Sequence, residues 1–206
     1  MGYAKGFPRA VKGYSTQLIR VDFDFFVSGT PRDKNDVEVL SRLGIERVVT
    51  FRPPSTEKFR KEKQALEMHG IELVYLPPKR GKVSADLLNS LNTINRLLGG
   101  KRLLAHCVHG NYSHVLGMGY LCQNGWSPLM AKALINRIRE KSFHQERLSL
   151  TPGEERYLKL AKTVSPITAP LRNRMRKTRA SASARSFSRP KRDALVRKYK
   201  IRIRPK

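Results

Sequence analysis

The sequence of 206 residues is poor in cysteine, in acidic side chains and in long apolar stretches. Its two cysteines, Cys107 and Cys122, are too few for a disulfide framework, which excludes a small secreted fold held together by disulfides. No stretch reaches the roughly 18 to 20 consecutive apolar residues of a membrane-spanning helix, so an integral membrane protein is excluded and no membrane partner is expected. Nothing at the start resembles a secretory signal peptide. We therefore expect an intracellular protein.

The scarcity of acidic residues gives the chain a strong positive charge. There are 42 Lys and Arg against 16 Asp and Glu, a formal net charge of +26. The charge is unevenly distributed, because residues 166–206 carry 15 cationic side chains and one acidic one, a net charge of +14, whereas residues 31–165 carry only +10. Such an imbalance is typical of proteins that bind a polyanion, most often a nucleic acid.

Residues 166–206 are expected to form a basic tail that is disordered alone and becomes ordered on its partner, because so polar a segment buries too little apolar area to offset its backbone entropy. A solubility tail or a nuclear-localisation signal is the alternative. Interspersed aromatic and branched residues such as Phe187, Tyr199 and Ile201 suit a segment that inserts into RNA. The candidate nucleic-acid-binding residues are the cations of this tail: Arg172, Arg174, Arg176, Lys177, Arg179, Arg185, Arg189, Lys191, Arg192, Arg197, Lys198, Lys200, Arg202, Arg204 and Lys206.

The first 21 residues carry four cations and no acidic side chain. They contain Gly2, Gly6 and Gly13 and lack clear amphipathic spacing, which does not favour a transit peptide. We therefore expect residues 1–21 to be a second basic extension.

Between residues 22 and 165 the hydrophobic pattern alternates between short apolar runs and amphipathic helical periods. Gly44 and Gly70 are typical residues for ending a helix, and Ser127 followed by Pro128 is typical of a helix start. This alternation predicts an α/β domain with a central, mostly parallel sheet flanked by helices on both faces. The expected strands are 25–29, 45–51, 71–76 and 102–107, and the expected helices are 36–43, 56–69, 84–98, 112–123, 127–140 and 151–161.

One strand–turn–helix segment carries the residues with the most chemical potential. Cys107 ends an apolar strand and is followed by a turn that contains Gly110 and then by an apolar helix. This arrangement places a sulfur above the backbone N–H groups of a turn and a helix N-terminus, which bind anions and lower the pKa of a thiol. It predicts a phosphate-binding loop with a cysteine nucleophile.

This segment resembles the signature loop of the cysteine-based protein phosphatases, specifically the small dual-specificity type. The signature is a histidine and a cysteine, a glycine three residues after the cysteine, and an Arg six residues after it that is followed by Ser or Thr. His106, Cys107 and Gly110 are in register with this signature. The resemblance implies that fold over roughly residues 22–162. It is supported by flanking segments that follow in the family's order: 48–52, Leu76 with Pro77, 125–139 and 151–158.

Two positions depart from the signature. The Arg position is Ser113, and the following Ser or Thr position is His114. The resemblance implies that the Arg grips two phosphate oxygens and stabilises transition-state charge, which a serine hydroxyl cannot do. The family's general-acid Asp, which follows the strand ending at Leu76 and Pro77, is also absent, because the first acid after it is Asp86, in the next expected helix. Two losses in one site predict a catalytically inactive loop formed by His106, Cys107, Gly110, Ser113 and His114.

Four alternatives exist for this loop. Residual phosphatase activity would need Arg80 or Lys79 to replace the missing cation. The loop could hold a phosphate without cleaving it, with Lys79, Arg80, Lys82 and Gly110 as the candidate anion-binding residues. Zinc binding by the local histidines and Cys107 is disfavoured because His106 and Cys107 are adjacent on a strand and point in different directions, so neither a metal nor another cofactor is expected. In the simplest case the cysteine and the histidines fill a collapsed site.

Together these features predict an inactive dual-specificity-phosphatase-like domain that serves as a structural RNA-binding subunit of a ribonucleoprotein. A ribosome, cytoplasmic or mitochondrial, is the most natural home for a small basic domain with basic extensions, and its partners would be ribosomal RNA and neighbouring proteins. The alternatives are a cysteine-dependent phosphatase, and an interaction protein whose tail binds an acidic lattice such as tubulin or packaged DNA.

Overall fold

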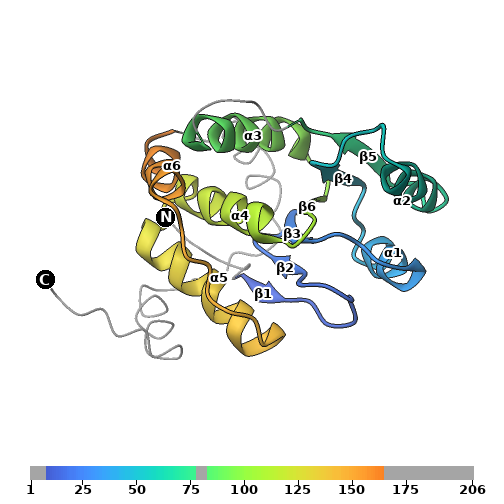
Figure 1. The fold of residues 1–206 in the computed structure, drawn as a ribbon, viewed down its shortest axis with the longest axis horizontal. Coiled ribbons are helices and arrows are strands. Elements are labelled where there is room, and N and C mark those ends of the chain that lie inside the picture. Colours follow the sequence, from blue (N-terminus) through green and yellow to red (C-terminus); the bar gives the residue numbers. More distant parts are fainter. Residues whose placement is uncertain (1–7, 78–82, 165–206) are drawn as a thin grey trace, which may run out of the picture. The chain divides into compact units, whose positions relative to one another are not determined.

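The computed structural model describes residues 8–77 and 83–164 (Figure 1). Lys79, Arg80 and Lys82, and all the cations expected to bind nucleic acid in residues 166–206, lie outside the described residues. Within the part that is described, no helix is long and apolar enough to cross a membrane.

Six strands form one sheet in the order β1-β2-β3-β6-β4-β5. The three pairings among β3, β6, β4 and β5 are parallel, and β1 and β2 join the β3 edge in antiparallel fashion. The predicted mostly parallel sheet is therefore confirmed. The strands are β1 Arg9–Ala10, β2 Ile19–Arg20, β3 Phe25–Gly29, β4 Arg47–Thr50, β5 Glu72–Tyr75 and β6 Leu103–Cys107.

Helices cover both faces of the sheet (Figure 1). The alternation of side chains along each strand decides which face a residue serves: Leu104 packs in one core with α1 and α2, whereas its neighbours Leu103 and Ala105 pack in a second core with α3 to α6. Adjacent buried residues in one short strand thus serve two layers, as expected for a parallel sheet covered on both sides. The helices are α1 Lys34–Arg42, α2 Glu57–Glu67, α3 Val83–Leu98, α4 Asn111–Gln123, α5 Pro128–Phe143 and α6 Pro152–Thr163.

The helix starts follow from local hydrogen bonding. The Ser127 hydroxyl accepts from the N–H of Met130 with Pro128 in the first turn, as the sequence predicted. Thr151 and Glu154 form a reciprocal capping box at the start of α6. The predicted helix ends hold within two or three residues.

The structure corrects the boundary expected at residue 22. β1 and β2 lie within the stretch predicted to be a basic extension, and Leu18, Ile19 and Val21 are fully buried. Because β1 and β2 are only two residues long, they leave no readable alternation in the sequence, and their stability comes from pairing with β3. The α/β domain therefore includes residues that the sequence assigned to an extension.

Candidate anion-binding site at the end of the central strands

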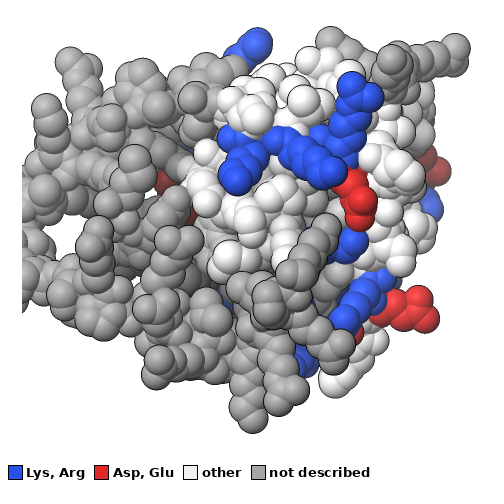
Figure 2. Space-filling model, turned by 90° about the vertical axis from the view of Figure 1, so that its left-hand side faces the viewer, with Lys and Arg blue, Asp and Glu red and all other residues white. Residues whose placement is uncertain are grey.

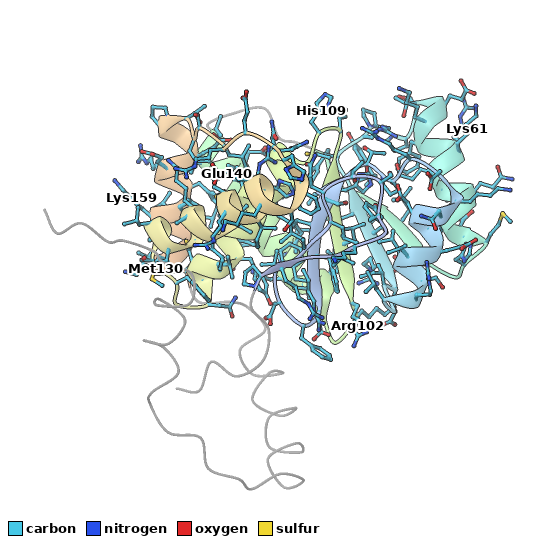
Figure 3. The ribbon with its side chains drawn as sticks, turned by 90° about the horizontal axis from the view of Figure 1, so that it is seen from below. Lys61, Arg102, His109, Met130, Glu140 and Lys159 are labelled. Atoms are coloured by element: carbon cyan, nitrogen blue, oxygen red, sulfur yellow. The ribbon has the colours of Figure 1, made fainter. Side chains whose placement is uncertain are left out.

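The carboxyl ends of the central parallel strands meet at one edge of the sheet. Gly29 at the end of β3 lies opposite Cys107 at the end of β6, and His106 lies opposite Thr50 of β4. Figure 3 shows His109, in the loop after β6, at the edge opposite to Arg102, which precedes that strand. Ligands of open α/β sheets bind outside the carboxyl ends of the strands, which makes this edge the candidate site.

The turn after Cys107 requires a glycine. Gly110 has a φ of 82° and is the N-cap of α4, to which it contributes no side-chain hydrogen bond. A Cβ atom at this position would lie 2.9 Å from Gln17 Oε1 and 3.2 Å from the backbone nitrogen of Gly29. A larger residue is excluded because the φ is in the left-handed region and because the neighbouring backbone leaves no room for a Cβ atom. A glycine at this position therefore lets the loop bring Cys107 close to the first turn of α4.

Ser113 occupies the signature Arg position but is fully buried. Its hydroxyl lies 2.7 Å from the carbonyl oxygen of Ser28 and 2.9 Å from that of Gly110, and it donates its hydrogen bond to these oxygens. The Cys107 Sγ lies 3.7 Å from the Ser113 Oγ. Ser113 thus ties α4 to β3 and the loop, and it carries no charge to an anion above the cysteine.

His114, at the following signature position, is also fully buried. Its Nδ1 lies 2.7 Å from Nη1 of Arg139 on α5, and its Nε2 lies 3.4 Å from the carbonyl oxygen of Gln17. Burial, reinforced by the Arg139 charge, lowers the pKa of His114 to about 3. The imidazole is therefore neutral at pH 7, and its Nδ1 accepts a hydrogen bond from the guanidinium.

Arg139 is a site residue that the sequence analysis did not single out. Its side chain is buried, with 5 % of its surface exposed, and its pKa is lowered by burial and raised by the nearby Cys107. A signal did exist: Arg139 falls four residues after Ile135 and directly follows Ile138, so it interrupts the apolar stripe of its helix. A charged residue in such a stripe needs an explanation.

A buried charged cluster supports the loop from the α2 side. Glu62 Oε1 lies 2.5 Å from Nε2 of His106, and Glu62 Oε2 lies 3.4 Å from Nη1 of Arg52. Arg52 also donates to the hydroxyl of Thr30, which in turn donates to the carbonyl oxygen of Cys107. Arg52, the last residue of the flanking segment 48–52, is therefore linked through Thr30 to the backbone of the loop.

The acid Asp86 lies in the first turn of α3, as predicted. Its carboxylate accepts a hydrogen bond from the Tyr112 hydroxyl at 2.9 Å. Tyr112 belongs to the first turn of α4, and its pKa is raised mainly by burial, with Asp86 and Cys107 adding to the effect. Asp86 therefore lies next to the loop through Tyr112, a placement that the sequence did not predict.

The remaining predicted residues have simpler surroundings. Cys122 is fully buried in the core, and burial raises its pKa to about 12, which confirms that it is a core residue. In residues 8–77 and 83–164, no group of three or more His, Cys, Asp or Glu is arranged to hold a metal ion. His106 and His114 instead face Glu62 and Arg139.

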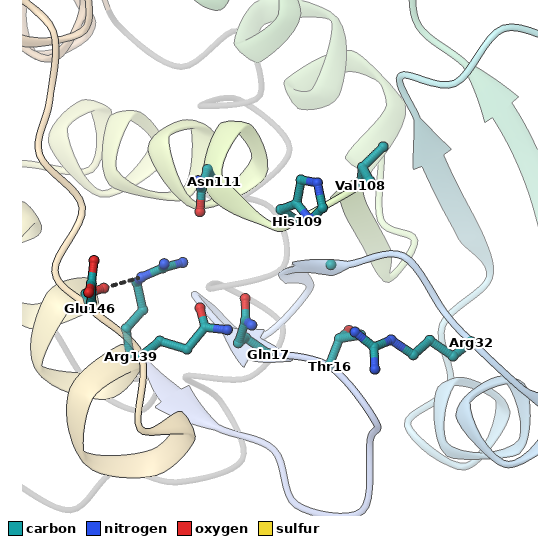
Figure 4. A pocket seen from close by; sticks show the side chains of 10 residues that line it. Thr16, Gln17, Arg32, Val108, His109, Asn111, Arg139 and Glu146 are labelled. Carbon is teal, nitrogen blue, oxygen red and sulfur yellow. Dashed lines mark hydrogen bonds between the residues drawn. The ribbon is translucent and has the colours of Figure 1, made fainter.

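A pocket of about 410 Å³ opens beside the loop (Figure 4). It is separate from the Cys107 side chain and is bordered by the β1–β2 connection, the loop after β6 and the end of α5. Ten residues line it: Thr16, Gln17, Gly29, Arg32, Val108, His109, Asn111, Arg139, Gln145 and Glu146.

Comparison with solved structures shows that the fold is that of the cysteine-based protein tyrosine phosphatases. The chain is similar to TpbA of P. aeruginosa (20 % identity, 79 % of this chain and all of that one, TM-score 0.57). It is also similar to PTPMT1 (20 % identity, 76 % of this chain and 99 % of that one, TM-score 0.53). A cysteine-to-serine form of TpbA has been crystallised with phosphotyrosine. No protein-family model and no curated protein matches the sequence.

Proposed function

We propose that this chain is a catalytically inactive protein with a phosphatase-like fold, and that it serves as a structural RNA-binding subunit of a ribonucleoprotein, most naturally a ribosome. The observation that carries the proposal is the state of Ser113. Its hydroxyl is buried between two backbone carbonyl groups, at the position where the signature places a guanidinium. Ser113 therefore offers no charge to an anion above Cys107, which supports a loop without catalysis.

The size of this loss supports a role without catalysis. Removing one preorganised group that stabilises transition-state charge costs on the order of 10² to 10³ in rate. The absence of a general acid after Pro77 removes a contribution of roughly 10² to 10⁴. The two factors do not multiply strictly, because residues that act together are not additive. Even so, either loss alone would leave a poor enzyme.

The positive charge supports RNA as the partner. Fifteen cations in residues 166–206 would neutralise phosphates independently of base sequence. The domain adds to them: residues 128–163 carry eight Lys and Arg against four Asp and Glu. Figure 2 shows several of the domain's cations exposed on one face.

The test is the salt dependence of RNA binding by three forms of the protein. The full chain should bind single-stranded RNA with an affinity that falls steeply with salt, by about 0.7 in the logarithmic slope for each phosphate neutralised. Deleting residues 166–206 should remove most of that slope. A matched form, in which the fifteen tail cations are replaced by Gln, should behave like the deletion, because charge and not chain length is responsible.

Salt-insensitive binding, or no binding by the full chain, would contradict the RNA proposal. Tighter binding to duplex DNA or to polymerised tubulin than to RNA, under the same salt conditions, would replace it with one of the other partners.

A residual cysteine-dependent phosphatase is the second candidate, favoured by the position of Asp86. The Cys107 thiolate would attack the phosphorus and break its bond to the ester oxygen, and Asp86, which hydrogen-bonds to Tyr112 of α4, would protonate that leaving oxygen. Water would then hydrolyse the phosphocysteine, releasing phosphate and the thiolate. Turnover of a phosphomonoester that is lost in both Cys107→Ser and Asp86→Asn would establish this activity. No turnover by the wild-type chain would exclude it.

A further inference from the structure

Arg139 is a buried cation without a carboxylate partner among the described residues. Its guanidinium donates to Nδ1 of His114 at 2.7 Å and to the backbone carbonyl oxygen of Glu146 at 3.3 Å (Figure 4). No carboxylate in residues 8–77 and 83–164 lies within 4 Å of it. Both of its partners are neutral, because His114 carries no proton at Nδ1 at pH 7.

An uncompensated buried charge is costly, and proteins retain one when something else supplies the opposite charge. The carboxylate of the adjacent Glu140 pairs with Arg147 instead, and the exposed Glu146 contacts Arg139 only through its backbone carbonyl oxygen. The guanidinium reaches the pocket of about 410 Å³ beside the loop. An anion bound in this pocket would therefore supply the negative charge that Arg139 lacks.

The other walls of the pocket supply further donors. Thr16 lines it, and the buried hydroxyl of this residue has no hydrogen-bond partner among the described residues. Arg32 enters from the segment after β3, and its side chain forms no ion pair with the described carboxylates. Asn111, the first residue of α4, brings the positive end of a helix to the same space. Two guanidinium groups, an unsatisfied hydroxyl and a helix N-terminus thus surround one cavity, with the Glu146 carboxylate at its border.

We propose that this pocket binds a phosphate group through Arg139 and Arg32, beside the cysteine loop and independently of the Cys107 sulfur. Arginine forks match the oxygens of phosphate, and the buried Thr16 hydroxyl would gain an acceptor. The pocket also falls in the size range of small-molecule sites, so it has room for the group that a phosphate monoester carries.

The test is a titration of the full chain with inorganic phosphate. Binding is monitored by the changes in the NMR signals of the Arg139 side chain and of the backbone amides of His109 and Asn111. Arg139→Met and Arg32→Gln should each weaken the binding about tenfold or more, the effect of losing a charge-assisted hydrogen bond. Thr16→Val should weaken it several-fold while leaving the unliganded protein no less stable, because the hydroxyl it removes has no partner there.

Two control variants test whether phosphate binding depends on the cysteine loop or on exposed surface charge instead of on the pocket. Cys107→Ser should retain phosphate binding, because Cys107 is not among the residues that line the pocket. Arg147→Gln removes an exposed arginine that pairs with Glu140 outside the pocket, and it should also leave binding unchanged. Loss of binding in Cys107→Ser with retention in Arg139→Met would overturn the proposal, and so would equal binding in Arg32→Gln and the wild type. Arg32 is exposed, so its variant remains informative if Arg139→Met fails to fold.

Ribose 5-phosphate and ribose distinguish the sources of the phosphate. Binding of the ester and of inorganic phosphate, but not of the sugar, supports the pocket, and the tighter of the two ligands identifies which form it prefers. Binding of ribose alone would contradict it. Deleting residues 166–206 should leave these shifts in place, so this proposal and the RNA proposal can fail separately.

Discussion

The neutral state of His114 predicts a specific acid sensitivity of the fold. The imidazole binds its proton with a pKa of about 6.5 in the unfolded chain and of about 3 in the folded one. Unfolding therefore takes up a proton between these pH values. The stabilising contribution is complete above about pH 6.5 and is lost progressively as the pH falls towards 3.

The magnitude follows from linkage. Each pH unit below 6.5 should lower the free energy of unfolding by nearly 1.4 kcal/mol through this one group, so the loss is about 2 kcal/mol at pH 5. The physical cause is specific: a proton on Nδ1 would face the Arg139 guanidinium at 2.7 Å, with both side chains buried.

Urea denaturation between pH 5 and 7.5 measures this effect in His114→Gln against the wild type. Glutamine keeps an acceptor for Arg139 but does not titrate, so the variant should lose about 2 kcal/mol less than the wild type on going from pH 7 to pH 5. His69→Gln, which removes an exposed histidine, is the control and should follow the wild type. Equal pH dependence in His114→Gln and the wild type would show that the reasoning about the buried imidazole is wrong.

Two further predictions concern packing and helix capping. Gly119→Ala should lower the free energy of unfolding in urea by about 2 kcal/mol or more, because the added Cβ would overlap the Tyr157 side chain. Gly117→Ala is the control on the same helix; its nearest contact would be at 3.1 Å, so it should cost less. Equal effects of the two changes would show that α6 can move away. Thr151→Ala should lower the free energy of unfolding by about 1 kcal/mol, because it removes half of the capping box of α6. Ser149→Ala, at an exposed position, is the control and should leave that free energy unchanged. Unchanged unfolding of Thr151→Ala would mean that the box contributes nothing.

Much of the domain could be predicted because its signals are local. The parallel strands are short apolar runs, and the helices begin at capping residues such as Ser127 and Thr151. The glycine required after Cys107 follows from the turn itself, and the absence of the signature Arg is visible at Ser113. These features depend on residues within a few positions of one another.

β1 and β2 were not predicted, because strands of two residues show no hydrophobic periodicity in the sequence and depend on their pairing within the sheet for stability. The partners of His114 also escaped it, since Gln17 is 97 positions away and Arg139 is 25 positions away. The placement of Asp86 beside Tyr112 depends in the same way on the packing of α3 against α4.

The fold class, the position of the cysteine loop and the concentration of positive charge in residues 166–206 all follow from the order of the residues. The use of the altered signature depends on the folded chain. Ser113 hydrogen-bonds to the backbone of β3 and of the loop, and His114 is a neutral acceptor for an arginine that has no carboxylate partner within residues 8–77 and 83–164. The physical reason is that a local pattern fixes which groups a segment offers. Whether a charge is compensated depends on every element packed around it, and that is a property of the folded chain.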